Sequence, residues 1–199
     1  MKHPVVVCIA GGSGSGKTTC ARLLAEALGP DRCVAIPHDA YYRPVPARAD
    51  LATWNFDAPD ALETSLLVEH LDQLLRGAPV DLPEYDFATH SRVGHPRLHP
   101  RPVLIVEGIL TLTSADLVAR CDHRVFVHTE EHVRLARRIR RDTTERGRTL
   151  DDVLYQYFRT VRPSHERWVE PTRELASLLI DGAGDLEDSV RSLTSLLDD

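Results

Sequence analysis

Short continuous apolar runs alternate along the chain with longer segments in which apolar residues recur every three or four positions. The first pattern predicts strands buried on both faces, and the second predicts amphipathic helices. The predicted strands cover residues 4–10, 33–38, 103–108, 123–128 and 177–181. The predicted helices cover residues 17–28, 59–76, 114–120, 131–146, 150–161, 164–175 and 185–197. Strands that alternate with helices favour an α/β fold with a parallel five-stranded sheet flanked by helices.

The chain has 199 residues, enough for one domain with its own core, and no internal repeat or linker divides it. We therefore expect a single domain over residues 1–199. Two segments, 40–58 and 79–102, are rich in Pro and show no clear period. Long irregular connections in a compact domain are often functional, so we expect these two insertions to bind a substrate.

Composition and charge exclude several classes of protein. The formal net charge is −6, whereas nucleic-acid-binding domains are usually basic, so we expect no nucleic-acid partner. No apolar run approaches the roughly 20 residues of a membrane helix, and the N-terminus enters the first predicted strand directly, so we expect neither a membrane span nor a signal peptide. The four cysteines are scattered without a C-x-x-C pair, which predicts reduced thiols in a cytoplasmic protein.

The stretch GGSGSGKT at 11–18 fits G-x-x-x-x-G-K-[ST], the phosphate-binding P-loop, and lies between a predicted strand and a predicted helix. Glycines let successive backbone N–H groups point at an anion, and the following helix N-terminus adds partial positive charge. Lys17 can reach the β- and γ-phosphates of a nucleoside triphosphate, and the Thr18 hydroxyl can hold Mg²⁺. The expected nucleotide-binding residues are Gly11, Gly12, Ser13, Gly14, Ser15, Gly16, Lys17, Thr18 and Thr19. The alternative, a Gly/Ser-rich turn that happens to contain lysine, leaves the flanking strand and helix unexplained.

Two acidic residues follow predicted strands, at the edge where a parallel sheet binds its ligands. Asp39 can take a proton from an attacking hydroxyl or hold a Mg²⁺-bound water. Glu107 follows a strongly apolar run, and a charge there is costly unless it is used, so we favour a role near the metal. The alternatives are a turn-forming Asp39 and a Glu107 that faces solvent.

Arginines are concentrated near residues 134–148. At 3.6 residues per turn, one helical face carries Arg134, Arg137, Arg138 and Arg141. Guanidinium groups suit phosphate oxygens, and Gly147 between Arg146 and Arg148 supplies a hinge. We therefore expect a lid at about 137–148. The alternative is a solvated basic helix face.

The chemistry-bearing residues belong to a series of motifs that runs through almost the whole chain. The motifs are GGSGSGKTT at 11–19, HDAYYR at 38–43, NFDAPDAL at 55–62, PEYDFATHSR at 83–92, IVEGIL at 105–110, RLARRIRRDTTERGR at 134–148 and QYFRTVRPSHERWVEPT at 156–172. The P-loop alone indicates only a nucleoside triphosphate, but the ordered set resembles the uridine–cytidine kinase family. The resemblance implies a P-loop kinase fold with an Arg-rich lid helix and a small acceptor-binding hairpin.

The same resemblance implies transfer of a phosphoryl group from ATP, or GTP, to the 5′-hydroxyl of uridine or cytidine, with Mg²⁺ as cofactor. It implies three catalytic residues: Asp39 as general base, Lys17 on the ATP phosphates and Arg141 in the lid. Arg146 joins Arg141 over the phosphates. The resemblance implies that Thr18 binds Mg²⁺, and since Glu107 and Asp39 follow predicted strands, the expected Mg²⁺ site is Thr18, Glu107 and Asp39.

The resemblance also implies how the acceptor is bound. Asp57 and Arg138 hold the ribose hydroxyls, while His90 and Tyr85 read the polar edge of the pyrimidine. The full implied acceptor set is Asp39, Tyr42, Phe56, Asp57, Tyr85, Phe87, His90, Arg138, Arg148 and Gln156. A homotetramer and feedback control by pyrimidine triphosphates are implied as well.

Three positions depart from the family pattern. Ala40 replaces a usual Ser or His, Tyr41 replaces a common Phe, and Ala58 stands where His is common. All three touch the acceptor region, which keeps open a P-loop kinase of another small hydroxyl substrate, such as phosphoribulose, pantothenate or nicotinamide riboside. A GTPase-type switch is disfavoured because the sequence lacks Asn-Lys-x-Asp, and an RNA-binding arginine helix is disfavoured by the acidic net charge.

Overall fold

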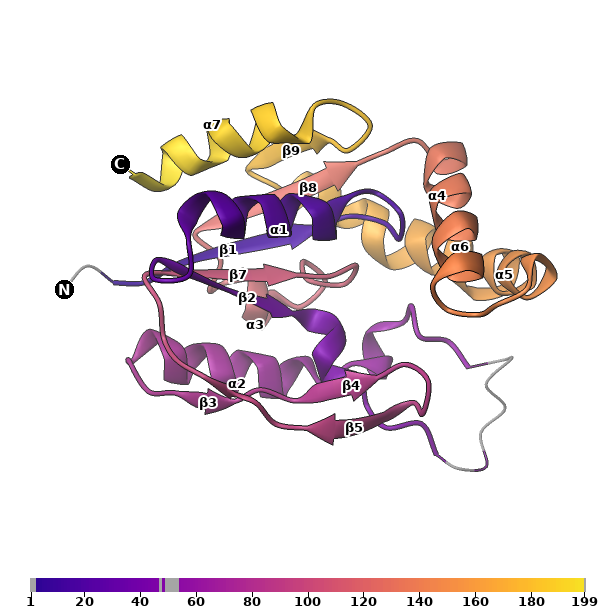
Figure 1. Ribbon diagram of the computed structural model, residues 1–199, viewed down its shortest axis with the longest axis horizontal. Helices are drawn as coiled ribbons and strands as arrows, with labels where there is room; N and C mark the ends of the chain where they lie inside the picture. The colour runs from indigo at the N-terminus through magenta and orange to yellow at the C-terminus, as the bar shows by residue number, and fades with distance from the viewer. Residues whose placement is uncertain (1–2, 47, 49–53, 199) are drawn as a thin grey trace.

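The computed structural model describes residues 3–46, 48 and 54–198. Its centre is a five-stranded sheet in the order β2-β7-β1-β8-β9 (Figure 1), and every neighbouring pair is parallel. The strands are β1 (Val5–Ala10), β2 (Cys33–Pro37), β7 (Val103–Glu107), β8 (His123–His128) and β9 (Leu178–Asp181). Each lies within its predicted range, so the predicted α/β fold is confirmed.

Helices cover both faces of the sheet (Figure 1). On one face lie α1 (Lys17–Leu28) and α7 (Leu186–Asp198), and on the other lie α2 (Thr64–Leu75) and α3 (Ala115–Val118). The predicted helix 59–76 is interrupted, because a 3₁₀ turn (Pro59–Ala61) comes before α2. The central strands are therefore buried on both faces, whereas Ala35 of β2 and Leu179 of β9, on the two edge strands, are exposed.

The central strand shows how this layering is encoded. Val7 and Ile9 of β1 belong to the same hydrophobic core as Leu24 of α1. Val6 and Cys8 belong to a second core, on the side of α2. Successive strand residues point to opposite faces of the sheet, and helices bury both faces at this strand. The sequence of β1 is therefore apolar throughout.

Short helical segments gather at the carboxyl end of the sheet (Figure 1). They are α4 (Glu131–Thr144), α5 (Leu150–Gln156), the π-helical Tyr157–Val161, α6 (Arg162–Ser164), the π-helical His165–Val169 and the 3₁₀-helical Glu170–Leu175. The predicted straight helices 150–161 and 164–175 are thus helical but irregular. Pro163 and Pro171 each remove a backbone donor there, which disfavours regular α-helical bonding. Within the described ranges, no helix is long and apolar enough to cross a membrane.

The hairpin of β4 (Glu84–Asp86) and β5 (Ser91–Gly94) in one insertion and the described residues of the other lie toward the carboxyl end of the sheet, whereas β3 (Val80–Asp81) lies nearer its amino end (Figure 1). In 79–102, the hairpin pairs β4 with β5, and β3 pairs with β6 (Arg97–Leu98). These strands are too short to show a period in the sequence, although the predicted small hairpin is present. The insertion 40–58 continues the 3₁₀ turn His38–Tyr41, and its residues 47 and 49–53 lie outside the described part.

The expectation of four reduced thiols is wrong. Cys8 and Cys121 form a disulfide with their Cα atoms 5.8 Å apart, while Cys20 and Cys33 are free and buried. Cys121 lies just before β8, and the Asp122 N–H donates to the Val6 carbonyl at 2.9 Å. Parallel pairing of β1 with β8 thereby brings together two cysteines 113 residues apart, which their spacing in the sequence does not reveal.

Candidate active site

The P-loop joins β1 to α1, and Lys17 is the first residue of that helix. Gly14 and Gly16 have φ values of 81° and 99°, a region that glycine enters at little cost. Gly14 also lacks room for a side chain, because a Cβ there would lie 2.4 Å from the Arg134 carbonyl oxygen. The start of α1 adds unpaired backbone N–H groups and partial positive charge, as an anion site requires.

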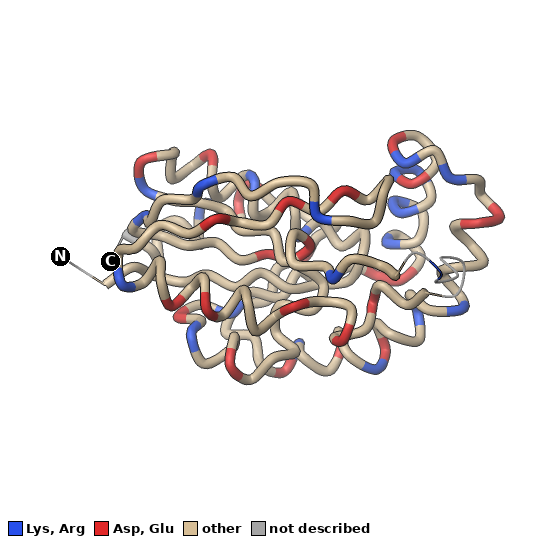
Figure 2. The backbone as a smooth tube through the Cα atoms, turned by 90° about the horizontal axis from the view of Figure 1, so that it is seen from below, with Lys and Arg blue, Asp and Glu red and all other residues tan. Residues whose placement is uncertain are grey.

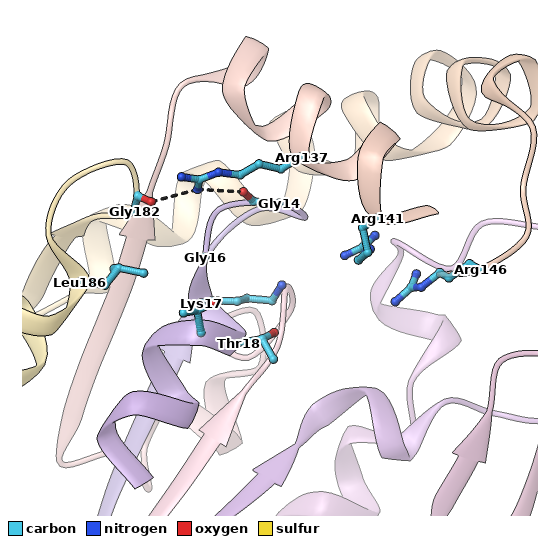
Figure 3. A pocket seen from close by; sticks show the side chains of 10 residues that line it. Gly14, Gly16, Lys17, Thr18, Arg137, Arg141, Arg146, Gly182 and Leu186 are labelled. Atoms are coloured by element: carbon cyan, nitrogen blue, oxygen red, sulfur yellow. Dashed lines mark hydrogen bonds between the residues drawn. The ribbon is translucent and has the colours of Figure 1, made fainter. Parts of the chain in front are cut away.

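A pocket of about 470 Å³, here called the donor pocket, opens beside the P-loop (Figure 3). It is lined by Gly14, Gly16, Lys17, Thr18, Thr19, Arg137, Arg141, Arg146, Gly182 and Leu186. Figure 3 shows Lys17, Arg141 and Arg146 directed toward a common space. Arg137 instead donates to the Gly182 carbonyl at 2.9 Å and so ties α4 to the loop after β9. Three cations and a helix N-terminus around one cavity favour a polyanion such as a triphosphate.

Other residues hold the P-loop from outside the donor pocket. The Thr129 hydroxyl donates to the Ser15 carbonyl at 2.9 Å, and the buried Arg134 Nε donates to the Thr129 carbonyl at 3.0 Å. A Cβ on Gly12 would lie 2.6 Å from an Arg134 guanidinium nitrogen, so α4 approaches the loop closely. Gly11, Gly12 and Ser15 do not line the donor pocket, and they serve this packing.

Oxygen ligands suited to Mg²⁺ lie next to Lys17. The Thr18 hydroxyl donates to Glu107 Oε2 at 3.1 Å, and Glu107 is only 9% exposed, so the alternative of a solvent-facing Glu107 is wrong. Burial raises the pKa of Glu107, and the charge of Lys17 opposes this shift. Asp39 Oδ1 is buried and has no hydrogen-bond partner among the described residues. A hydroxyl and two carboxylates fit Mg²⁺, which usually completes its shell with waters and substrate phosphates.

A second pocket of about 280 Å³, here called the acceptor pocket, adjoins the first. It is lined by Ser13, Lys17, Thr18, Pro37, Asp39, Tyr42, Phe56, Asp57, Phe87, His90, Glu107, Ile109, Arg138, Arg141, Arg146, Arg148 and Gln156. Every residue of the predicted acceptor set except Tyr85 is among them. The two pockets share Lys17, Thr18, Arg141 and Arg146, which mark the place where they meet.

One side of the acceptor pocket is aromatic. The rings of Phe56 and His90 stack with centroids 5.0 Å apart, and Tyr42 meets Phe87 edge to face at 5.9 Å. Tyr85 packs behind, 5.3 Å from Tyr42, and its hydroxyl is buried without a hydrogen-bond partner in the described part of the chain. His90 Nδ1 is likewise buried and unpartnered there. Flat rings beside unused polar atoms suit a planar heterocycle with hydrogen-bonding groups.

A second group of residues lining the acceptor pocket is charged or polar. Arg138 donates to Ser13 Oγ at 2.9 Å and to Gln156 Oε1 at 2.8 Å, and Arg148 also donates to Gln156. Asp57 is 7% exposed, and its pKa is raised by burial against the opposing charge of Arg138. A carboxylate and a guanidinium on one wall can bind vicinal hydroxyls.

The predicted lid consists of the end of α4 and the loop that follows it. Gly147 has φ of 62° and open space around it, as a hinge requires. Arg134 and Arg138 are buried against the P-loop, so the alternative of a solvated basic face is wrong for them, whereas Arg140 is exposed. Figure 2 shows several Lys and Arg positions close together at the end of the molecule opposite the termini, where α4 lies.

Asp142 organises this lid, and sequence reasoning did not single it out. Its side chain is fully buried and accepts from Arg141 Nε at 2.8 Å, with Arg138 and Arg146 at 3.5 and 3.6 Å. Burial alone would raise the pKa of Asp142, but the hydrogen bond from Arg141 and the three positive charges lower it. The available signal was an acidic residue directly after Arg140 and Arg141, one of two acidic residues in the arginine-rich run.

Known proteins resemble this chain over most of its length. Uridine kinases from Chloroflexus aurantiacus and Geobacillus kaustophilus are 45% and 43% identical to it, each over 92% of this chain and 88% of the relative. The structure of phosphoribulokinase from Rhodobacter spheroides superposes with a TM-score of 0.66 at 16% identity, covering 92% of this chain and 74% of that one. The family model described as phosphoribulokinase / uridine kinase family matches residues 6–187. With its P-loop, paired pockets and arginine-rich helix α4, the chain belongs to the phosphoribulokinase / uridine kinase family.

Proposed function

We propose that this enzyme transfers the γ-phosphoryl group of ATP to the 5′-hydroxyl of uridine or cytidine, giving the nucleoside monophosphate. The meeting of the donor and acceptor pockets at Lys17, Thr18, Arg141 and Arg146 carries this proposal. A phosphoryl group in one pocket and a hydroxyl in the other would meet beside these cations and next to Asp39. The relatives named uridine kinase, at up to 45% identity, support the acceptor class.

Phosphoryl transfer depends mainly on aligning the attacking and leaving oxygens and on stabilising charge. In the proposed mechanism, Lys17 and the N-terminus of α1 bind the β- and γ-phosphates. Arg141 and Arg146 stabilise the charge that develops on the transferred group. Asp39 accepts the proton of the 5′-hydroxyl. Mg²⁺, held by Thr18, Glu107 and Asp39, would neutralise further phosphate charge.

The two walls of the acceptor pocket support a nucleoside acceptor. Phe56 and His90 provide the aromatic surface for a pyrimidine, and the unpartnered His90 Nδ1 and Tyr85 hydroxyl lie within that aromatic group. Asp57 and Arg138 would bind the ribose hydroxyls on the charged wall. A site built to hydrogen-bond its substrate discriminates strongly against analogues that lack the partner groups.

A coupled kinase assay tests the reaction. The purified protein is given Mg²⁺ with ATP or GTP and a panel of acceptors: uridine, cytidine, ribulose 5-phosphate, pantothenate and nicotinamide riboside. Turnover with uridine or cytidine well above the others is expected. Turnover with one of the other acceptors, and none with the pyrimidine nucleosides, would replace the proposal with a different small-hydroxyl kinase.

Substitution of His90 tests base recognition. His90 has φ of 51°, so His90→Ala combines the loss of the ring with backbone strain, whereas His90→Asn tolerates this conformation better. Both variants should lower kcat/KM for uridine by about tenfold, through the lost stacking and hydrogen bonding. The KM for ATP should stay within about twofold. Equal losses toward uridine and ATP would instead assign His90 a structural role.

The proposal also includes a cytoplasmic location, where both substrates are found, and a homo-oligomer, a tetramer by family resemblance. Disulfides are rare in the cytoplasm, but Cys8 is fully buried, so the bond to Cys121 is shielded from reductants on that side. Light scattering of the purified protein measures the oligomeric state directly.

A further inference from the structure

The turn that carries Phe56 and Asp57 into the acceptor pocket is held by its own neighbours. Asn55 Oδ1 accepts a hydrogen bond from the Asp57 backbone N–H at 3.0 Å. The Tyr42 hydroxyl donates to the Phe56 carbonyl at 3.0 Å. The orientation of the Asn55 amide therefore fixes the backbone from which the Asp57 carboxylate projects.

Asn55 is itself held by a residue 109 positions further along the chain. Its Nδ2 donates to Ser164 Oγ at 3.0 Å, and Ser164 Oγ donates back to Asn55 Oδ1 at 3.3 Å. Ser164 is only 4% exposed, so water has little access to replace it. The serine hydroxyl holds the amide group in place, and the Asp57 N–H, which requires an acceptor, sets which end of the amide is the oxygen.

The residue after Ser164 contacts the P-loop. His165 lies so close to Gly12 that a Cβ on the glycine would be 2.9 Å from the imidazole Cε1. The other side of the imidazole is held by Glu170, with Nε2 3.2 Å from a carboxylate oxygen. Two adjacent residues of one irregular helical segment thus reach the acceptor turn and the P-loop.

We infer that Ser164 is a positioning residue for the acceptor sugar: acting through Asn55, it sets the Asp57 carboxylate at a fixed place relative to Arg138 and the P-loop. This inference rests on the proposed nucleoside kinase function. If the inference holds, loss of the Ser164 hydroxyl affects binding of the acceptor and not of the nucleotide. Loss of the Ser164 hydroxyl loosens binding of the sugar hydroxyls and leaves the donor pocket, which neither Asn55 nor Ser164 lines, unchanged.

The experiment measures steady-state kinetics of Ser164→Ala with uridine, 2′-deoxyuridine and ATP. The KM for uridine should rise about 5–10-fold, the size of one or two lost hydrogen bonds, with kcat and the KM for ATP within about twofold. The preference for uridine over 2′-deoxyuridine should fall by a similar factor. Thr172→Val is the matched control, because it removes a buried hydroxyl that donates to the nearby Val169 carbonyl and lines neither pocket, and its kinetics should not change.

A double-mutant cycle separates positioning from general loosening. Asn55→Ala should resemble Ser164→Ala, and the double variant should be no worse than the poorer single one, because both act through the same contact.

If Ser164→Ala does not fold, Asn55→Asp decides the question: it keeps the acceptor for the Asp57 N–H, loses the donor to Ser164, and should raise the uridine KM about 2–3-fold. Unchanged uridine KM and sugar preference in variants of an active wild-type enzyme would overturn the inference. Wild-type protein inactive on pyrimidine nucleosides would overturn the proposed function instead.

Discussion

Replacing Asp39 by asparagine should lower kcat about 10²–10⁴-fold while the affinity for ATP stays within about twofold. Of the two pockets, Asp39 lines the acceptor pocket alone, where the attacking hydroxyl would bind, while Lys17 and Thr18 line both pockets and would still hold Mg²⁺–ATP in the variant. Its buried Oδ1 has no partner in the described ranges, which leaves it available as a proton acceptor. The amide is nearly the same size, so the pocket should keep its shape while losing the base.

Single-turnover kinetics together with ATP titration by calorimetry would measure the two effects separately. Asp60→Asn is a suitable control, because Asp60 is an exposed carboxylate in the 3₁₀ turn Pro59–Ala61 and lines neither the donor nor the acceptor pocket. The control should keep full activity. Turnover of Asp39→Asn at the wild-type rate would remove Asp39 as general base. Equal loss of ATP affinity and turnover would point to a role in Mg²⁺–ATP binding alone.

The sheet was predictable because its strands are buried on both faces. β1 and β7 are apolar at almost every position, and both cores draw on them, so a continuous apolar run is their direct signature. The P-loop was predictable for a different reason. Its anion-binding geometry is local, since φ above zero at Gly14 and Gly16 and the start of α1 all lie within one short stretch.

Features that depend on contacts between distant segments were harder to predict from the sequence. The Cys8–Cys121 bond forms because β8 pairs with β1. The spacing of the cysteines along the chain does not predict which strands are neighbours in the sheet. The hairpin strands β4 and β5 are three and four residues long, too short for a period to emerge. The hydrogen bond between Asn55 and Ser164 joins two polar segments, and neither segment has a sequence pattern that indicates a contact with the other.

The candidate site shows the same division. The acceptor residues could be named from the sequence because each belongs to a recognisable motif. In the structure they line one pocket, except Tyr85, which packs behind Tyr42. Asp142 lies inside the motif at 134–148, but nothing in that motif assigned it a role. Its importance follows from being the fully buried carboxylate among the lid arginines, and burial of one residue in a charged run depends on how α4 packs against the P-loop.

Asp142 therefore provides the second large expected effect. Its carboxylate offsets Arg138, Arg141 and Arg146, and the side chains of Arg141 and Arg146 are 29% and 37% exposed. Removing one partner of a fully buried ion pair costs about 3–5 kcal/mol. Because these two arginines can regain water, we expect Asp142→Asn to lose about 2–3 kcal/mol, below that range. In a domain of this size, the loss lowers Tm by about 5–10 °C.

The same substitution should impair catalysis, because Arg141 and Arg146 line both pockets and lose the group that orients them. We expect kcat to fall about tenfold, the effect of about 1.4 kcal/mol on the barrier. Asp188→Asn, which breaks the exposed ion pair with Arg191 in α7, should change neither Tm nor kcat noticeably.

Acidification supplies an independent check on Asp142. The pKa of its carboxyl is lowered in the folded protein, so its stabilising effect is present above the usual aspartate value of 3.8 and is lost as the pH falls below that value. The Tm difference between wild type and Asp142→Asn should therefore be constant near neutral pH and shrink at pH values under 3.8. Calorimetric melts across that range measure it. A difference that is absent at neutral pH would mean that the three arginines do not depend on this carboxylate for their arrangement.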